Sequence, residues 1–127
     1  MRLKNISLNY GMKVFKALSE ESRVRIIHLL IHNKELSISD IEHILEFTQT
    51  KTSRHLAYLK NAGLVGSRRV DQWMFYYILD EAIEIINQIF QFIQKDGALI
   101  RDQEVYTILY SNRELAINKI ENNPYRK

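Results

Sequence analysis

The stretch Thr48-Gln49-Thr50-Lys51-Thr52-Ser53-Arg54-His55-Leu56-Ala57-Tyr58-Leu59-Lys60-Asn61-Ala62-Gly63 decides the fold. Its first residue has a hydroxyl that can cap a helix, and its last, a glycine, can adopt the left-handed conformation that ends one. Helical spacing puts Thr52, Leu56 and Leu59 on one stripe, and it puts a polar set on the opposite stripe: Thr50, Lys51, Arg54, Ala57, Tyr58 and Asn61. We therefore expect a helix with one side packed and the other free to dock.

Elements on both sides of this helix complete a motif. Ser39 with Glu42 three residues later predicts a capping box and a short helix over 40–46, followed by a turn at Phe47. Residues 64–69 and 73–79 are rich in β-formers and predict a hairpin, although its turn lacks glycine. The aromatic residues of the hairpin alternate between its faces, which favours a packing role over base stacking. The pattern is two helices joined by a tight turn, then a two-stranded hairpin.

Positive charge is concentrated in the same region. The whole chain of 127 residues carries a net charge of only +3. However, residues 48–70 contain no acidic residue, whereas acidic residues flank them on both sides. The basic residues in this region are Lys51, Arg54, Lys60, Arg68 and Arg69. Such a local basic surface favours nucleic acid as the partner; the alternative is a solvated basic face with no partner.

Further helices are predicted before and after this motif. They cover 8–18, then a segment capped by Ser19 and running to about Asn33, then 80–95, and finally 101–120 after a break at Asp96 and Gly97. We expect Asn122 to Pro124 to end the last helix and residues 125–127 to fray. The expected organisation is a DNA-binding domain over 1–95, including a dimerisation helix, and a C-terminal helical extension over 96–127.

The helix over 80–95 has two apolar stripes, so it needs two partners. One stripe holds Ile85, Ile89 and Phe92. A second copy of the chain is expected to cover one face, and the alternative is burial within the same subunit. We assign the dimer interface to Ile83, Ile86, Phe90 and Ile93.

Three segments together resemble the ArsR family of winged-helix repressors, over about Met12 to Leu79. They are Ala17-Leu18-Ser19-Glu20-Glu21-Ser22-Arg23-Val24-Arg25-Ile26, then Thr48-Gln49-Thr50-Lys51-Thr52-Ser53-Arg54-His55-Leu56 with Leu59, and Ala62-Gly63-Leu64-Val65. The resemblance implies a mainly α, winged helix-turn-helix fold with a two-stranded β-hairpin wing and C-terminal dimerisation helices. It also implies a homodimer that binds a double-stranded operator and often releases it when a ligand or metal arrives.

A helix that enters the major groove reads bases with residues near its N-terminus, while a wing reaches the backbone. We therefore predict DNA contacts from Gln49, Thr50, Lys51, Ser53 and Arg54, and phosphate or minor-groove contacts from Arg68, Arg69 and Gln72. His55 could face DNA or be packed. The operator is expected to be an imperfect palindrome, and repression is the expected outcome.

Metal ligands of the family are missing from this sequence. Thiolate sensors of the family carry two cysteines one residue apart, where this chain has Ser37 and Ser39, and the chain has no cysteine at all. The other family site uses Asp and His pairs on the dimer helix, but 80–95 contains no histidine. His28 and His32 have the spacing of metal ligands, yet we interpret them as surface or boundary residues because no third ligand is evident. We predict no metal and no cofactor. A small-molecule effector remains open, and the tail from Gly97 onward could help form its pocket.

Other functions are disfavoured by the composition. Four scattered glycines form no phosphate loop, and no cysteine nucleophile or Ser/His/Asp grouping is recognisable, so an enzyme is not expected. The chain has no long apolar run of the kind that predicts a membrane span or a leader. We therefore expect a cytoplasmic protein. The alternative function is a winged-helix protein-interaction module that does not bind DNA.

Overall fold

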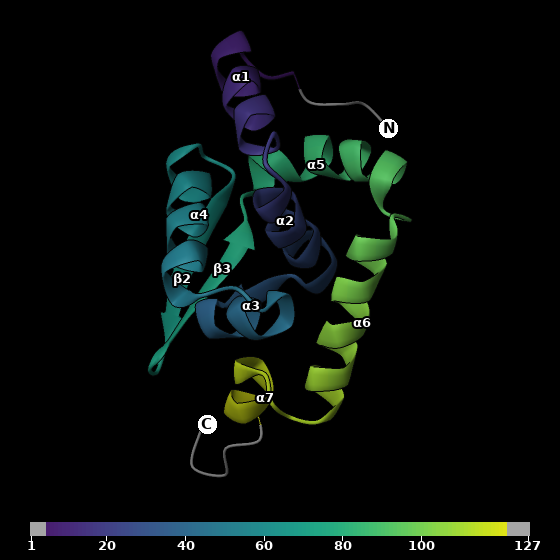
Figure 1. The fold of residues 1–127 in the computed structure, drawn as a ribbon. Helices are drawn as coiled ribbons and strands as arrows, with labels where there is room; N and C mark the ends of the chain where they lie inside the picture. Colours follow the sequence, from purple (N-terminus) through teal and green to yellow (C-terminus); the bar gives the residue numbers. More distant parts are fainter. Residues whose placement is uncertain (1–4, 122–127) are drawn as a thin grey trace.

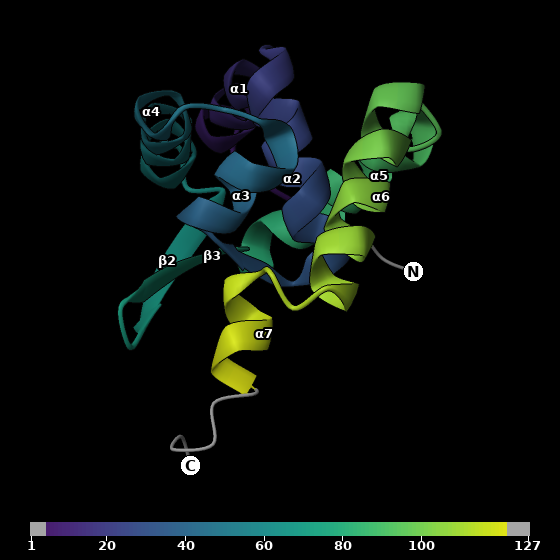
Figure 2. The same ribbon diagram turned by 60° about the horizontal axis from the view of Figure 1, so that its bottom comes forward.

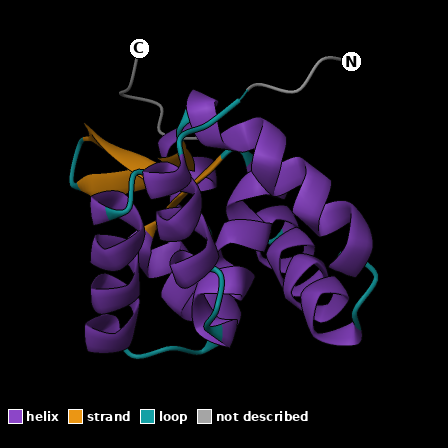
Figure 3. Ribbon diagram, turned by 90° about the horizontal axis from the view of Figure 1, so that it is seen from above, coloured by secondary structure: helices purple, strands orange, loops and turns teal. Residues whose placement is uncertain are grey.

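The computed structural model describes residues 5–121 of the 127. Within them the chain is mainly helical, with one small antiparallel sheet (Figures 1 and 3). The elements are α1 (Leu8–Ala17), α2 (Glu21–Asn33), β1 (Glu35–Ser37), α3 (Ile38–Leu45), α4 (Gln49–Asn61), β2 (Val65–Val70), β3 (Trp73–Ile78), α5 (Asp80–Ile93), α6 (Gly97–Ser111) and α7 (Ala116–Glu121). This order confirms the winged helix-turn-helix architecture.

The helix-turn-helix is formed by α3 and α4. As predicted, the Thr48 hydroxyl accepts a hydrogen bond from the Lys51 amide at 3.1 Å, and Gly63 ends the region with a φ of 81°. Two other caps were predicted wrongly. The box that begins α3 pairs Ser37 with Asp40, not Ser39 with Glu42, and α2 is capped by Glu20 rather than Ser19. Both helices therefore begin close to, but not at, the expected residues.

The wing is the predicted β2–β3 hairpin, with Asp71 and Gln72 as its two-residue turn and a φ of 55° at Asp71. The hairpin is not alone, because β1 pairs with β3 and the strand order is β1-β3-β2. This third strand was not expected. Phe75 is fully buried, and it packs with α7 residues Ala116 and Ile120. The predicted packing role of the wing aromatics is confirmed at this position.

The C-terminal extension forms two helices where one was predicted. The chain turns between α6 and α7 with Arg113 in the left-handed region, at a φ of 63°. Figures 1 and 2 show α6 beside α2, opposite the side occupied by α4, and α7 below α3 near the hairpin. The predicted end at Asn122 to Pro124 and the fraying at 125–127 lie outside the described residues.

Three polar contacts hold the extension against the helix-turn-helix. Asp102 of α6 accepts hydrogen bonds from the Arg25 guanidinium of α2. The amides of Asn33 and Gln103 exchange two hydrogen bonds, at 2.8 and 2.9 Å. The Asp40 carboxylate, besides capping α3, accepts a 2.8 Å hydrogen bond from the backbone amide of Ala116. The extension is thus fixed to α2 and to α3.

The predicted dimer stripe on α5 needs a correction. Ile86 is fully buried and Phe90 is 2% exposed, and both belong to the hydrophobic core of their own subunit. Of the four assigned residues, only Ile83 and Ile93 retain accessible surface. Phe92, on the stripe that was not assigned, is 88% exposed. The assignment of Ile86 and Phe90 to a second copy was therefore wrong, since helical spacing defines a stripe but not what covers it.

No helix within residues 5–121 is both long enough and apolar enough to cross a membrane.

Candidate nucleic-acid interface

The N-terminal turns of α4 present a polar surface to solvent. Gln49, Thr50, Ser53 and Arg54 are exposed, whereas Thr52 on the opposite side is fully buried. The Thr52 hydroxyl donates to the Thr48 carbonyl at 2.8 Å, which fixes the buried side of the first turn. The helix therefore presents amide, hydroxyl and guanidinium groups, which are the groups that hydrogen-bond to base edges and phosphates.

Lys51 differs from its neighbours because it is half-buried. Its ammonium lies 4.0 Å from the centroid of the Phe47 ring, a cation–π contact that orients the side chain along the turn between α3 and α4. The Lys51 ammonium group therefore stays near the N-terminal end of the recognition helix α4. Phe47 therefore helps to position a predicted DNA-binding residue, a role that the sequence did not reveal.

On the wing, the two predicted arginines have different surroundings. Arg68 forms a two-pronged ion pair with Glu35 of β1, in which its Nε donates to Oε2 at 2.8 Å. That hydrogen bonding raises the pKa of Arg68. Arg69 is exposed and has no ion-pair partner within residues 5–121. Gln72 is exposed at the turn. The wing thus offers one arginine, Arg69, without an ion-pair partner in the described part of the chain. The charge of the other, Arg68, is balanced by Glu35 on β1, the strand that was not expected.

His55, which could have faced DNA, is packed instead. It is 8% exposed, its Nε2 lies 3.5 Å from a Glu20 carboxylate oxygen, and its Nδ1 lies 3.5 Å from an Arg23 guanidinium nitrogen. Burial lowers the pKa of His55, while the Glu20 carboxylate opposes that shift. Arg23 also lies over the ring of Tyr58, 4.1 Å from its centroid. His55 and Arg23 therefore connect the recognition helix α4 to α2.

Exposed apolar residues are found on α1 and at the end of α5. Large side chains there remain open to solvent although each could pack against protein: Leu8 at 82%, Met12 at 45%, Phe15 at 60% and Phe92 at 88%. Exposed large apolar residues gathered on helices mark protein interaction surfaces. We call these four residues the α1–α5 face.

Within residues 5–121, no group of three or more histidine, aspartate or glutamate side chains is arranged to hold a metal ion. Ser37 and Ser39, which the resemblance places where thiolate sensors have cysteines, lie with their hydroxyl oxygens 3.1 Å apart.

The fold and this surface define a winged helix-turn-helix protein. One family profile, described as bacterial regulatory protein, arsR family, matches residues 20–67. The arsenic resistance transcriptional regulator ArsR1 of Pseudomonas putida is 41% identical over 68 residues, which cover 54% of this chain and 53% of that protein. The cadmium resistance transcriptional regulatory protein CadC homolog of Staphylococcus aureus is 34% identical over 96 residues, covering 76% of this chain and 73% of that protein.

Solved structures give the same result. HlyU from Vibrio cholerae superposes with a TM-score of 0.64 at 30% identity, covering 71% of this chain and 100% of that one. Mb0332 from Mycobacterium bovis, described as a homodimeric winged helix-turn-helix DNA-binding domain, has a TM-score of 0.58 at 31% identity, covering 68% and 77%. The chain belongs to the arsR family of bacterial regulatory proteins. These are regulators and not enzymes, and the chain spans about half the length of the Pseudomonas protein.

Proposed function

We propose that this protein is a sequence-specific transcriptional regulator that binds double-stranded DNA, and that it acts as a repressor. The observation that carries the proposal is the exposed N-terminal face of α4, with Gln49, Thr50 and Arg54 open to solvent and Arg69 exposed on the adjacent wing. In helix-turn-helix proteins this part of the recognition helix reads bases, while contacts to phosphate fix the register.

The regulator acts as a homodimer on an imperfect palindrome. The α1–α5 face supplies the apolar surface that a second copy would cover, and the Mycobacterium bovis neighbour is described as homodimeric. A two-fold symmetric dimer places its two recognition helices in successive major grooves, roughly 34 to 36 Å apart. Symmetry of the protein then requires approximate symmetry of the operator.

The signal is not a metal bound by thiolates. Two relatives carry the names of arsenic and cadmium resistance regulators. Soft ions of this kind prefer thiolate ligands, and this chain has no cysteine. The hydroxyl of Ser37 or Ser39 is a poor substitute for a thiolate ligand. If DNA binding is regulated, the signal is therefore something other than a metal bound by thiolates.

The test is binding of the purified protein to a labelled duplex from upstream of its own gene, compared with a scrambled duplex over a series of salt concentrations. We expect preference for the native duplex, with log K falling linearly against log salt because bound cations are released from the phosphates. A folded dimer that binds neither duplex at low salt would overturn the proposal and favour a protein-interaction module.

A further inference from the structure

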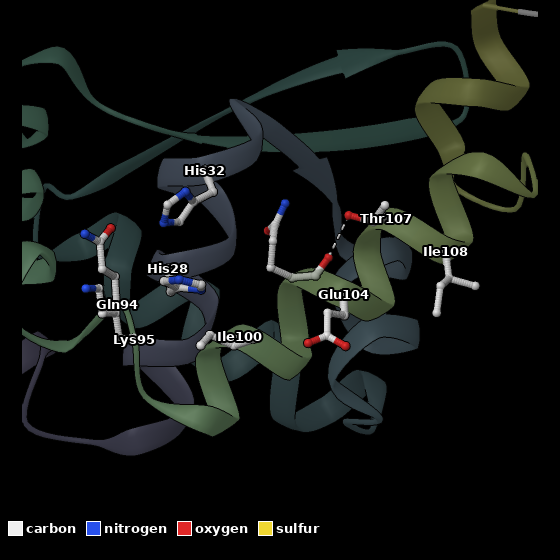
Figure 4. A pocket seen from close by; sticks show the side chains of 9 residues that line it. His28, His32, Gln94, Lys95, Ile100, Glu104, Thr107 and Ile108 are labelled. Carbon is white, nitrogen blue, oxygen red and sulfur yellow. Dashed lines mark hydrogen bonds between the residues drawn. The ribbon is translucent and has the colours of Figure 1, made fainter.

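A cleft of about 590 Å³ separates α2 from the C-terminal extension. Its walls come from α2, from α6 and from the residues that follow α5, and they include His28, His32, Lys95, Ile100, Glu104 and Ile108. Figure 4 shows His28 and His32 on α2, across the cleft from Ile100 and Glu104 on α6. The volume lies within the range of sites that bind small organic molecules.

His28, one of the residues that line this cleft, has an unsatisfied hydrogen-bonding atom. The residue is 2% exposed, and its buried Nδ1 has no hydrogen-bond partner among residues 5–121. Its ring is held in place by the His32 ring, with centroids 4.5 Å apart, and by an edge contact with Phe90 at 5.9 Å. Buried polar atoms of native proteins nearly always have a partner. The His28 imidazole, which lines the cleft and contains this unpaired nitrogen, is therefore a position where a ligand group would be stabilised.

The imidazole at this position is neutral. The pKa of His28 is lowered to about 4, mainly by burial and also by the neighbouring His32, while Asp102 acts in the opposite direction. The same exclusion of water would oppose a charged ligand group beside the His28 ring. A hydroxyl or amide suits the site better, because either can donate to or accept from a neutral imidazole, whichever tautomer is present.

The cleft is held in shape by contacts that a ligand would not need to form. The Arg25–Asp102 ion pair and the Asn33–Gln103 amide pair fix α6 on α2 beside it. The exposed Ile100 and Ile108 add apolar wall, and Lys95 and Glu104 contribute one charge of each sign at exposed positions. The site therefore selects an apolar body rather than a net charge.

From this geometry we propose that the cleft between α2 and α6 binds a small uncharged organic molecule with an apolar body and one hydroxyl or amide group that hydrogen-bonds to the His28 imidazole. Resting on the DNA-binding function proposed above, this molecule is the effector of the regulator.

Two structural connections would transmit its binding. Helix α2 carries His28 at the cleft and, nearer its N-terminus, Arg23, which contacts His55 and Tyr58 of the recognition helix. Helix α6 leads into α7, whose Ala116 amide is bound by Asp40 at the start of α3. A ligand that changes the spacing of α2 and α6 therefore acts on both helices of the DNA-binding motif.

The test uses 4-propylphenol as the uncharged probe and 4-propylbenzoate as a charged control of similar shape. The full chain, labelled with ¹⁵N, is titrated with each compound while the imidazole and backbone resonances are followed, with no DNA present. We expect saturable binding of the phenol with the His28 imidazole perturbed, and at least tenfold weaker binding of the benzoate. Absence of saturable phenol binding, or equal binding of the two compounds, would overturn the proposal.

Two variants locate the site. His28→Leu removes the imidazole, and Ile100→Trp fills the cleft from a position that is 44% exposed. Each should weaken phenol binding at least tenfold, and unchanged affinity in a folded Ile100→Trp protein would refute the location. A second titration, with the native duplex present, tests the effector role: a bound phenol that leaves DNA affinity unchanged overturns that role alone. Because the first titration contains no DNA, failure of the regulator function would not affect its result.

Discussion

Asp102 accepts two hydrogen bonds from the guanidinium of Arg25, each 2.9 Å long, across 77 positions of sequence. The carboxylate is 4% exposed and the arginine side chain is 24% exposed. The pair therefore joins the C-terminal extension to α2 with one member fully buried and the other reaching solvent.

This asymmetry predicts unequal effects of removing each partner. Arg25→Met leaves a buried carboxylate without its counter-charge and should lower the free energy of unfolding by about 3 kcal/mol. Asp102→Asn leaves an arginine that water can reach, and should cost only about 1 kcal/mol. Urea denaturation measures both, with Arg101→Met on the exposed side of α6 as the control. Equal losses for the two variants would contradict the burial argument.

Arg54 is expected to read a base. Arg54→Ala should weaken operator binding by about 1 to 3 kcal/mol and relax the preference at one base pair, because a guanidinium can bond bidentately to guanine. Fluorescence anisotropy with single-substitution duplexes measures this effect. Arg101→Ala removes the same charge on the other side of the molecule and should leave affinity unchanged. A uniform loss over all sequences would instead identify a phosphate contact.

The Glu35–Arg68 pair should limit the positive charge that the wing offers to DNA. Glu35→Gln removes the carboxylate charge, so Arg68 can neutralise a phosphate, and the slope of log K against log salt should become steeper by about 0.9. The matched variant Arg68→Gln should change the slope little if the native ion pair persists on DNA. A large decrease with Arg68→Gln would show that DNA already displaces Glu35.

The α1–α5 face should hold the dimer together. Phe92→Glu and Phe15→Glu should each produce folded monomers with much weaker operator binding, because each places a charge on an apolar contact. Sedimentation velocity measures the oligomeric state. Ile108→Glu, at an exposed apolar position on α6, should remain dimeric. Ile86→Glu should instead unfold the chain, since Ile86 is fully buried. A Phe92→Glu protein that stays folded, dimeric and normal in DNA binding would refute this interface.

His28 should make stability depend on pH. Its pKa is about 4 in the folded protein and about 6.5 when unfolded, so between these values the unfolded chain binds the extra proton. Stability should therefore fall as pH falls from about 6.5 to 4, by on the order of 3 kcal/mol. Urea midpoints at pH 7 and pH 4.5 test this, with His28→Gln as the reference that removes this titration. Parallel pH profiles for the two proteins would rule out the predicted contribution.

The part of the fold that local chemistry determines could be predicted from the sequence. Thr48 and Gly63 bound α4 correctly, because an N-cap hydroxyl and a left-handed glycine act within one turn of the chain. The hairpin of the wing could be predicted because its two strands are rich in β-forming residues. The strand β1 could not be predicted, because three residues, Glu35 to Ser37, carry no pattern of their own and pair only with the distant β3.

The start of α3 was misplaced for a different reason. The segment contains two overlapping boxes, Ser37 with Asp40 and Ser39 with Glu42, and local rules favour neither. Tertiary structure selects the first, since Asp40 also receives the Ala116 amide of α7.

The candidate site was predicted unevenly. The exposure of the candidate DNA-contact residues of α4 could be predicted because helical spacing separates them from Thr52 and Leu56. Two features could not be seen: the pairing of Arg68 depends on the unexpected β1, and the orphan nitrogen of His28 depends on packing against Phe90 and His32. Likewise, both stripes of α5 are apolar, so the sequence could not show whether Phe90 or Phe92 faces the core.

The shared carboxylate of Asp40 restricts how this protein can be recombined with its relatives. A chimera that grafts α6 and α7 onto another regulator of the family must carry an acceptor at this position, or the α7 amide would be buried without a partner. In the opposite design, a chain shortened to the DNA-binding part would leave one oxygen of Asp40 without its hydrogen-bond donor. Modular exchange at residue 96 therefore requires a compensating change 56 positions earlier, inside the recognition motif itself.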